Sequence, residues 1–401
     1  MQAGHLHYNP LTIVTSPFDL LKAELAEREA AGLLRSRRLV DGPQQPLLQV
    51  DGREMLSFCS NDYLGLASHP ALVAAQQQAA GEAGVGSGAS HLITGHHRLH
   101  HELEQALAAF VGLPRALLFS TGYMANLGVV STLVGRGDAV FADRLNHASL
   151  NDAVVLSRAE LKRYPHNDMA VLEKLLAASS AKCKLVVADA VFSMDGDLAP
   201  LPQLLELCER FNAWLLLDDA HGFGVLGMHG RGILEHFNLR NPRIIYMATL
   251  GKAAGVFGAF VAGEPELVEY LLQSARTYIY TTAMPPALAG ALLAALPIIE
   301  QESWRRAQLQ TLIATLRDGL KLQRWRLDPS PTPIQPLIIG GNEEAVRVSQ
   351  HLREQGILVP AIRPPTVPQG TARLRISLSA AHSVADVERL VAALHAAEAC
   401  S

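Results

Sequence analysis

Lys252 lies in a stretch rich in small residues, Met247–Gly258, which begins where the apolar run Ile244–Met247 ends. The apolar run is typical of a buried strand, and the small residues would let a bulky group approach the backbone. A lysine sheltered from water has a lowered pKa, and its amine is then nucleophilic enough to form a Schiff base. Taken alone, the stretch fits an ordinary lysine in a glycine-rich loop better.

Two carboxylates, Asp218 and Asp219, end a second apolar run, Leu215–Leu217, and His221 follows them. A carboxylate at the end of a buried strand is costly unless a cation meets it. A protonated pyridine nitrogen is such a cation. An aspartate beside a pyridinium and a Schiff-base lysine are the protein groups that pyridoxal 5'-phosphate (PLP) chemistry uses.

The motif Asp-Asp-Ala-His-Gly at residues 218–222, taken with Thr-Leu-Gly-Lys at 249–252, resembles the α-oxoamine synthases, a group of fold-type-I PLP enzymes. The similarity extends from about Leu20 to about Leu394 and is carried by several separated motifs, among them Asn-Asp-Tyr-Leu-Gly at 61–65. It implies a PLP-dependent transferase, specifically a C-acyltransferase, that works as a homodimer with shared active sites.

Within this group, residues 280–286 and 362–368 look like the branch that serves biotin biosynthesis. The resemblance to that branch implies a condensation of L-alanine with a pimeloyl thioester, in which CO2 and the free thiol leave. The thioester is carried by coenzyme A or by an acyl-carrier protein, and the sequence favours neither carrier.

The resemblance also implies which residues are catalytic. Lys252 binds PLP and then removes the α-proton of L-alanine, while Asp218 keeps the ring nitrogen protonated. His147 stacks on the cofactor ring, for which a flat, polarisable side chain is suited. His221 and Ser193 tune the phenolic oxygen, and Ser193 follows a strand-like run at a loop position suited to that bond.

The phosphate group of PLP is expected at Gly122 and Tyr123, where a strand-like run turns into a helix. Backbone N–H groups at a helix start form a ready anion site. The resemblance adds Thr249 from the same chain, and Thr281 or Thr282 from a second subunit.

The resemblance places the substrates at Arg35, Asn61, His147, Thr366 and Arg375. It gives Arg375 the carboxylate of the amino acid, a task for which an arginine fork is suited. Thr366 lies in the proline-rich loop 364–368, which fixes its position at little entropic cost, and is expected to contact the acyl thioester. Arg35 or Arg363 would meet the distal carboxylate of the pimeloyl chain.

Three other functions stay open. A sister enzyme of the group, such as a glycine C-acetyltransferase, would pair glycine with another acyl-CoA. A non-catalytic protein with a PLP fold would act through subunit contacts, but retention of Lys252, Asp218, His147 and His221 together speaks against it. A nucleotide-binding dehydrogenase would use the glycine-rich residues 84–90, yet no strong apolar strand precedes them.

Histidines crowd residues 91–101, and His97 and His101 are four apart, so they would share a helix face. No carboxylate or cysteine of recognisable ligand spacing accompanies them, so we expect helix-start and surface histidines and no metal site. His100 matches a histidine of the family, whereas the family often has an arginine at the position of His91.

The composition suits a compact globular enzyme, since 49% of the 401 residues are hydrophobic and 18% are charged. The net charge of -4 gives no sign of a nucleic-acid or anionic-membrane partner. The four cysteines have no paired spacing and are expected to be reduced thiols in a cytoplasmic protein, and no secretory signal is visible. Prolines interrupt the uncharged stretch 278–299, which is expected to hold a buried helix over 287–296 instead of a membrane span.

Strand-like runs alternate with helical patterns over residues 116–260, which predicts an α/β fold with a mostly parallel central sheet and helices on both faces. Ligands of such folds bind beyond the carboxyl ends of the strands. Gly122, His147, Ser193, His221 and Thr249 all follow strand-like runs, which places them at that edge independently of the resemblance.

Three parts of the chain are expected: an N-terminal arm and helix over 1–60, a large PLP-binding domain over 61–299, and a small α+β domain over 300–401. The amphipathic helix of the arm is expected over 18–38, ending in a basic cluster that includes Arg35. In the small domain, helices are expected over 304–322 and 343–355, and strands over 334–339 and 372–378.

Overall fold

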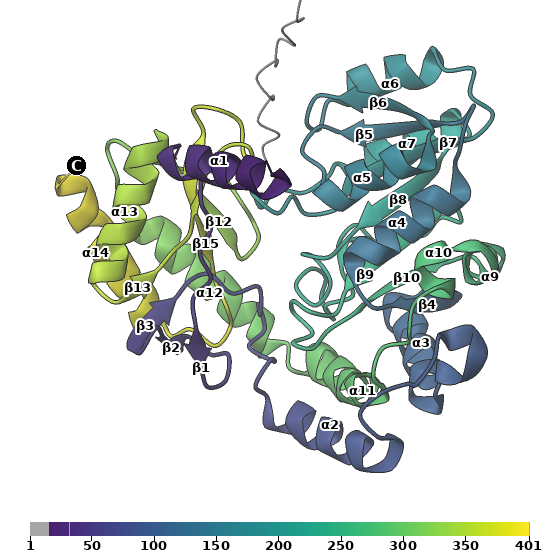
Figure 1. Cartoon of the computed structure of the whole chain (residues 1–401), viewed down its shortest axis with the longest axis horizontal. Helices are drawn as coiled ribbons and strands as arrows, with labels where there is room; N and C mark the ends of the chain where they lie inside the picture. The colour runs from purple at the N-terminus through teal and green to yellow at the C-terminus, as the bar shows by residue number, and fades with distance from the viewer. Residues whose placement is uncertain (1–15, 32, 401) are drawn as a thin grey trace, which may run out of the picture.

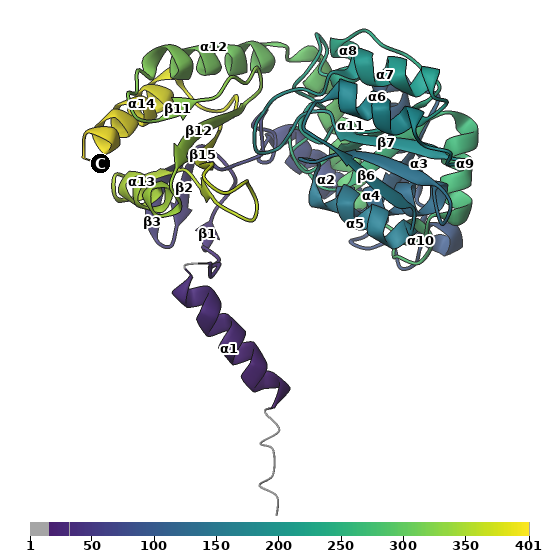
Figure 2. The same cartoon turned by 90° about the horizontal axis from the view of Figure 1, so that it is seen from above.

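The structure, a computed structural model, describes residues 16–31 and 33–400. The chain folds into two lobes, with the active-site strands in the larger one (Figure 1). The first helix, α1 (Pro17–Ala30), projects away from both lobes (Figure 2), and none of its residues is buried.

The large lobe is built on a seven-stranded sheet of order β4-β10-β9-β8-β7-β5-β6. Only β10 runs antiparallel to its neighbours, so the mostly parallel sheet that the sequence predicts is confirmed. The strands are β4 (Arg115–Phe119), β5 (Ala139–Asp143), β6 (Glu160–Tyr164), β7 (Lys184–Asp189), β8 (Trp214–Asp218), β9 (Ile244–Thr249) and β10 (Ala259–Gly263).

Both faces of this sheet are covered, because its strands carry apolar side chains on both sides. In β8, Leu215 and Leu217 belong to one hydrophobic core, and Leu216 between them belongs to the other. Helices α3 (Arg98–Val111), α6 (Met169–Ala177), α7 (Leu201–Arg210) and α11 (Pro286–Gln301) contribute to the first core. Helices α4 (Gly122–Leu133), α5 (Ala148–Ser157), α9 (Pro265–Ser274) and α10 (Arg276–Ile279) contribute to the second.

The small lobe is an α+β unit with two four-stranded sheets. One sheet has the order β11 (Arg326–Leu327), β12 (Ile334–Gly340), β15 (Ala372–Ser377) and β14 (Ala361–Ile362). The other has the order β1 (Val40–Asp41), β2 (Leu47–Val50), β3 (Arg53–Ser57) and β13 (Ile357–Leu358). Its helices are α12 (Trp304–Gly319), α13 (Asn342–Glu354) and α14 (Val384–Ala399).

The pairing of β3 with β13 joins the N-terminal strands to the C-terminal part of the chain. The boundaries after residues 60 and 299 stay predictions. We propose that residues 40–57 belong to the small domain, because their sheet is completed by a strand from residues 357–358. The remaining elements are α2 (Pro70–Ala83), the one-turn helix η1 (His91–Gly95) and α8 (Ile233–His236).

The N-terminal helix is shorter than the sequence predicted. It ends at Ala30 instead of residue 38, so Arg35 lies in an extended segment beyond it. The amphipathic face that the sequence predicted is not confirmed, because the apolar residues of α1 do not gather on one side of the helix, and Leu20, Leu21 and Leu25 are all exposed.

The predicted helix over 287–296 is confirmed as part of α11, with Pro286 in its first turn. No helix within residues 16–31 and 33–400 is long and apolar enough to cross a membrane. The four cysteines, all in the described part of the chain, are free thiols, as the sequence predicted.

Candidate active site

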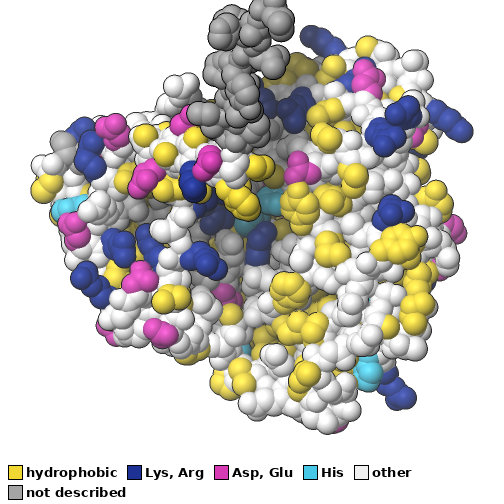
Figure 3. Space-filling model, viewed as in Figure 1, with side chains coloured by type: hydrophobic (Ala, Val, Ile, Leu, Met, Phe, Trp, Pro, Cys, Tyr) yellow, Lys and Arg dark blue, Asp and Glu magenta, His cyan; other side chains and the backbone are white. Residues whose placement is uncertain are grey.

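Five strands of the large sheet deliver the predicted site residues to one edge. Strands β4, β5, β7, β8 and β9 all run in the same direction, so their carboxyl ends lie together. The segments that follow these ends carry, in strand order, Gly122, His147, Ser193, His221 and Lys252. The structure therefore brings these predicted residues to one edge of the sheet, and their role as the site stays a prediction. Figure 3 shows a recess between the lobes in which histidine and basic side chains are visible.

The amine of Lys252 contacts a histidine in a sheltered place. Its Nζ lies 3.0 Å from Nε2 of His221, and burial lowers the pKa of Lys252 to about 8, although Asp218 and Asp189 oppose this shift. The loop of Lys252 is tight: Gly255 has a φ of 72°, and a Cβ there would lie 2.6 Å from the backbone carbon of Leu66. The small residues around Lys252 are thus needed to seat the loop.

His221 is buried and neutral. Burial lowers its pKa well below the usual range, and the positive charges of Lys252 and Arg375 act in the same direction. Its Nδ1 lies 2.7 Å from the hydroxyl of Tyr63, which is fully buried. Both ring nitrogens are therefore engaged, so the ring orientation is fixed.

Asp218 is held by two donors at the end of β8. Its Oδ2 accepts a hydrogen bond from Nδ2 of Asn126 at 2.8 Å, and its Oδ1 accepts one from the backbone N–H of Ala220 at 3.1 Å. Asn126 also donates to Oγ of Ser149 at 2.9 Å, and that oxygen lies 2.7 Å from Nδ1 of His147. These hydrogen bonds connect Asp218 with His147, and both residues are predicted to contact the cofactor ring.

The carboxylate of Asp219 bonds to a neighbouring loop and to β9. Its Oδ2 accepts hydrogen bonds from the backbone N–H of Ile233 at 2.7 Å and from the hydroxyl of Tyr246 at 2.8 Å. Burial raises the pKa of Asp219 to about 7. These contacts tie the 219–233 loop to β9 through Oδ2 of Asp219, whereas its Oδ1 is buried and has no hydrogen-bond partner among the described residues.

A second buried carboxylate lies beside Asp218. The register of β7 and β8 pairs Asp189 with Asp218, and Asp189 accepts a hydrogen bond from the backbone N–H of His147 at 3.1 Å. Burial, and then the charge of Asp218, raise the pKa of Asp189 well above its usual range. Two adjacent buried carboxylates favour a cation between or beside them. The protonated pyridine ring of PLP is such a cation, and its N–H can donate a hydrogen bond to a carboxylate.

The start of α4 fits the phosphate of PLP. The side chain of Thr121 caps the helix by accepting a hydrogen bond from the N–H of Met124 at 3.1 Å. The N–H groups of Gly122 and Tyr123 have no hydrogen-bond partner within the described residues. A Cβ on Gly122 would lie 2.5 Å from Cγ2 of Thr249, so only glycine allows the two segments to approach. The side chain of Tyr123 is exposed and bonds to Asp152.

Arg375 of the small lobe reaches into the same region. Its Nε donates to the backbone oxygen of Ser193 at 2.6 Å, and its two Nη atoms lie 3.3 Å from Oδ1 of Asn61 and from the hydroxyl of Tyr63. Arg375 is buried. The predicted residues Arg375, Ser193 and Asn61 are therefore brought together, and they join β15 to the loop after β7.

Four predicted residues lie outside this network. Arg35 is exposed in the extended segment after α1, and the exposed Thr366 uses its N–H to bond the backbone oxygen of Arg363 at 3.0 Å. Thr281 and Thr282 lie between α10 and α11 and make no hydrogen bond with the site residues within the described chain. Their roles stay predictions.

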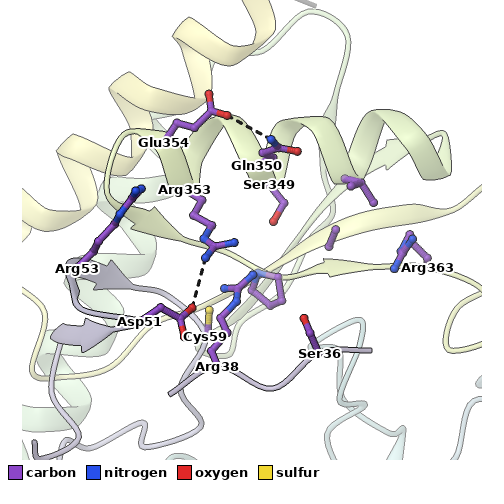
Figure 4. A pocket seen from close by; sticks show the side chains of 13 residues that line it. Ser36, Arg38, Asp51, Arg53, Cys59, Ser349, Gln350, Arg353, Glu354 and Arg363 are labelled. Carbon is purple, nitrogen blue, oxygen red and sulfur yellow. Dashed lines mark hydrogen bonds and ion pairs between the residues drawn. The ribbon is translucent and has the colours of Figure 1, made fainter. Parts of the chain in front are cut away.

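A separate cavity lies in the small lobe, against α13 (Figure 4). Its volume is about 880 Å³, and its lining includes Arg38, Arg53, Arg353 and Arg363. The Arg353 guanidinium pairs with Asp51 at 3.4 Å. None of the predicted cofactor residues lines this cavity, but Arg363, a predicted partner of the distal carboxylate, does.

Sequence reasoning assigned no role to Tyr63, Asn126, Ser149 or Asp189. Tyr63 was inside the Asn-Asp-Tyr-Leu-Gly motif, and Asp189 ends an apolar run as Asp218 does, so both positions carried a readable signal. Asn126 and Ser149 are polar residues within four positions of Gly122 and His147, and that proximity was the only hint.

In protein from which PLP has been removed, Lys252 should react as an amine of lowered pKa. Only the neutral amine is nucleophilic, so its reductive methylation by formaldehyde should accelerate with pH up to about 8 and then level off. Peptide mass spectrometry follows Lys252, and a free lysine derivative with the ordinary pKa of 10.5 is the control. A rate at Lys252 that rises in parallel with the control well above pH 8 would contradict the sheltered amine.

The sequence matches the family aminotransferase class I and II over residues 53–394. The chain is 63% identical to the 8-amino-7-oxononanoate synthase of Methylobacillus flagellatus, a match that covers 98% of this chain and 99% of the relative. It is 62% identical to the protein of the same name from Nitrosospira multiformis, with 96% and 98% of the two chains covered.

Solved structures share the fold. Serine palmitoyltransferase from S. paucimobilis with bound PLP–myriocin matches with a TM-score of 0.89, at 32% identity over 96% of this chain and 98% of that one. The 8-amino-7-oxononanoate synthase from Francisella tularensis matches with a TM-score of 0.74, at 33% identity over 85% and 96% of the two chains. With these relatives and the site geometry, the chain belongs to the aminotransferase class I and II family and to the 8-amino-7-oxononanoate synthase group within it.

Proposed function

We propose that the chain catalyses the PLP-dependent condensation of L-alanine with a pimeloyl thioester to 8-amino-7-oxononanoate, a step of biotin biosynthesis. A bond forms between the α-carbon of alanine and the thioester carbonyl carbon, and the carbon–sulfur bond breaks to release the thiol. The bond from the α-carbon to its carboxylate then breaks to release CO2, and a proton takes its place. The proposal is carried by the 63% identity to an 8-amino-7-oxononanoate synthase over 98% of the chain.

PLP, when bound, supplies an electron sink for negative charge at the α-carbon of the amino acid. The residue that moves the proton at this carbon is Lys252. Burial lowers the pKa of its amine to about 8, close to the value that suits a base near neutral pH. The contact with His221 at 3.0 Å fixes the direction of the amine.

Asp218 keeps the ring nitrogen protonated, and Asn126 and the N–H of Ala220 hold its two oxygens in place. His147 would stack on the ring, and its Nδ1 is connected to Asn126 through Ser149. His221 and Ser193, which follow the ends of the neighbouring strands β8 and β7, would bond to the phenolic oxygen. The neighbouring positions of β5, β7 and β8 in the sheet support these roles.

The N–H groups of Gly122 and Tyr123 and the hydroxyl of Thr249 would hold the phosphate; the methyl group of Thr249 packs close to Gly122, and its hydroxyl makes only a long bond of 3.5 Å to the backbone oxygen of Ala220. Thr281 or Thr282 of a second copy completes this site in a homodimer. The exposed apolar side chains of α1, among them Leu20 and Leu25, support an assembly that covers them.

Arg375 binds the carboxylate of L-alanine. Its 3.3 Å hydrogen bonds to Asn61 and Tyr63 are long, so a carboxylate that accepts two shorter, charge-assisted bonds can replace them. Asn61 remains beside the substrate. We further propose a cytoplasmic location, which the four free cysteine thiols support.

A substrate panel tests the proposed function directly. L-alanine and glycine are offered with pimeloyl, acetyl, succinyl and palmitoyl thioesters, each on coenzyme A and on an acyl-carrier protein, and products are identified by mass. We expect 8-amino-7-oxononanoate from L-alanine and a pimeloyl thioester as the main product. A preference for glycine with acetyl-CoA would instead make the chain a sister enzyme.

The Asp218→Asn variant should bind PLP but exchange the α-proton of L-alanine with solvent deuterium much more slowly. The amide keeps the shape and removes the charge, so the loss should reach roughly a hundredfold if about 3 kcal/mol of stabilisation is removed. Proton exchange is followed by NMR. The matched control is Asp219→Asn, which alters the neighbouring carboxylate that bonds to Ile233 and Tyr246. Equal exchange in the two variants would remove the role of Asp218.

The Thr366→Val variant should weaken use of the pimeloyl thioester and leave binding of L-alanine unchanged. A lost hydroxyl contact to a charged group costs about 1.5–3 kcal/mol, so kcat/KM for the thioester should fall roughly ten- to hundredfold. Heptanoyl thioester, which lacks the distal carboxylate, should show a much smaller loss.

Thr371→Val is the matched control for this variant, because Thr371 lies in the same loop and its hydroxyl bonds only to the backbone oxygen of Pro368, at 2.7 Å. If Thr366→Val and Thr371→Val have the same kinetics with both thioesters, Thr366 is a structural residue and the acyl chain binds elsewhere.

A further inference from the structure

A group of potential metal ligands lies at the start of α3, outside the active-site network. His96, His101 and Glu104 each offer one ligand atom, and these atoms lie within 4.8 Å of one another. His101 and Glu104 are three residues apart on α3, so they share a helix face, and His96 precedes the helix by two residues.

These are not the partners that the sequence suggested. His97, expected to share a face with His101, is the N-cap of α3, and its Nδ1 accepts a hydrogen bond from the N–H of Leu99 at 3.2 Å. His100 is fully buried, and its nitrogens are committed to the N–H of His97 at 3.0 Å and the backbone oxygen of Met284 at 2.8 Å. The carboxylate that the sequence analysis did not find is Glu104.

His91 contacts the ring of His96 and can hold it in place. The Nδ1 atoms of His91 and His96 are 2.9 Å apart, so one of them donates a hydrogen bond to the other. His91 is itself buried and stacks on the ring of Tyr278 with centroids 4.9 Å apart. Metal-binding histidines commonly use one ring nitrogen for the ion and the other for such a supporting hydrogen bond. His96 has this arrangement.

The site is open to small ions. His101 and Glu104 line a surface cavity of about 450 Å³, together with Gln105 and Arg115. The charge of Arg115 is met by Glu269 at 2.7 Å. Gln105 donates a hydrogen bond to Nε2 of His101 at 3.0 Å, so this nitrogen carries no proton, and an ion that binds there replaces the Gln105 amide. Oε1 of Glu104 accepts a hydrogen bond from Leu118 at 2.9 Å, which leaves its other oxygen available.

We propose that His96, His101 and Glu104 bind a divalent transition-metal ion of the Zn²⁺ class. Two histidines and a carboxylate are a known ligand set for Zn²⁺, with bonds of about 2.0–2.2 Å and an open position for water. The ligand atoms must approach one another to reach these bonds, and His96 and His101 are exposed enough to rotate. The ion would fasten the segment before α3 to the helix itself.

The test uses Co²⁺ as the probe on PLP-loaded, EDTA-treated protein. We expect one Co²⁺ per chain with the visible d–d absorption of a tetrahedral site, displacement by Zn²⁺, and a Tm that rises with metal concentration because only the folded state binds. His101→Gln and Glu104→Gln should each weaken Co²⁺ binding by about tenfold or more.

His351→Gln is the matched control, because His351 also contacts a glutamine four residues on, Gln355 at 2.7 Å, on the exposed face of α13. This variant should bind Co²⁺ as the parent does. His101 is exposed, so its variant should fold, and circular dichroism checks both ligand variants. Parent protein without saturable Co²⁺ binding, or both ligand variants with unchanged affinity and d–d absorption, would overturn the proposal.

Discussion

Two carboxylates lie side by side at the carboxyl edge of the central sheet, and the whole site depends on how their charge is balanced. The register of two parallel strands pairs Asp189 with Asp218, so the sheet itself creates the crowding. Burial raises the pKa of Asp189, whereas burial lowers the pKa of the Lys252 amine opposite. Burying any one of these charges alone costs free energy, but the negative carboxylates and the positive charge of a cationic ring offset one another. This balance explains why PLP suits the site better than a neutral ligand would.

The small lobe adds a second charge that the sheet cannot supply. Arg375 is buried, and its hydrogen bonds to Ser193 and Asn61 cross from β15 to the large lobe. The guanidinium also helps to keep His221 neutral. A negative substrate group that enters between the lobes therefore meets a fixed cation on one side and a deprotonatable amine on the other. The two lobes are needed together for this arrangement.

The sequence predicted those features that depend on local pattern. Apolar runs that end in polar residues located the strand ends, and the positions of Lys252, Asp218 and His221 followed from them. It did not predict contacts between distant segments: Tyr63 meets a histidine 158 residues away, and Asn126 meets Asp218 across 92 residues. The overlong N-terminal helix is another kind of error, because helical periodicity continued past the point where the helix ends. Glu104 lies three residues after His101, so this possible metal ligand could have been predicted from the spacing in the sequence.

Four predicted site residues lie outside the hydrogen-bond network around Lys252. Arg35 and Thr366 are exposed, and Thr281 and Thr282 lie on a connection between helices with no bond to the site. The apolar residues of α1, Phe18 included at 72% exposure, are uncovered in the same single chain. A chain that leaves large apolar side chains of its first helix exposed gains from pairing with a second copy, because the association can bury them. The exposed apolar side chains of α1 thus support the proposed homodimer.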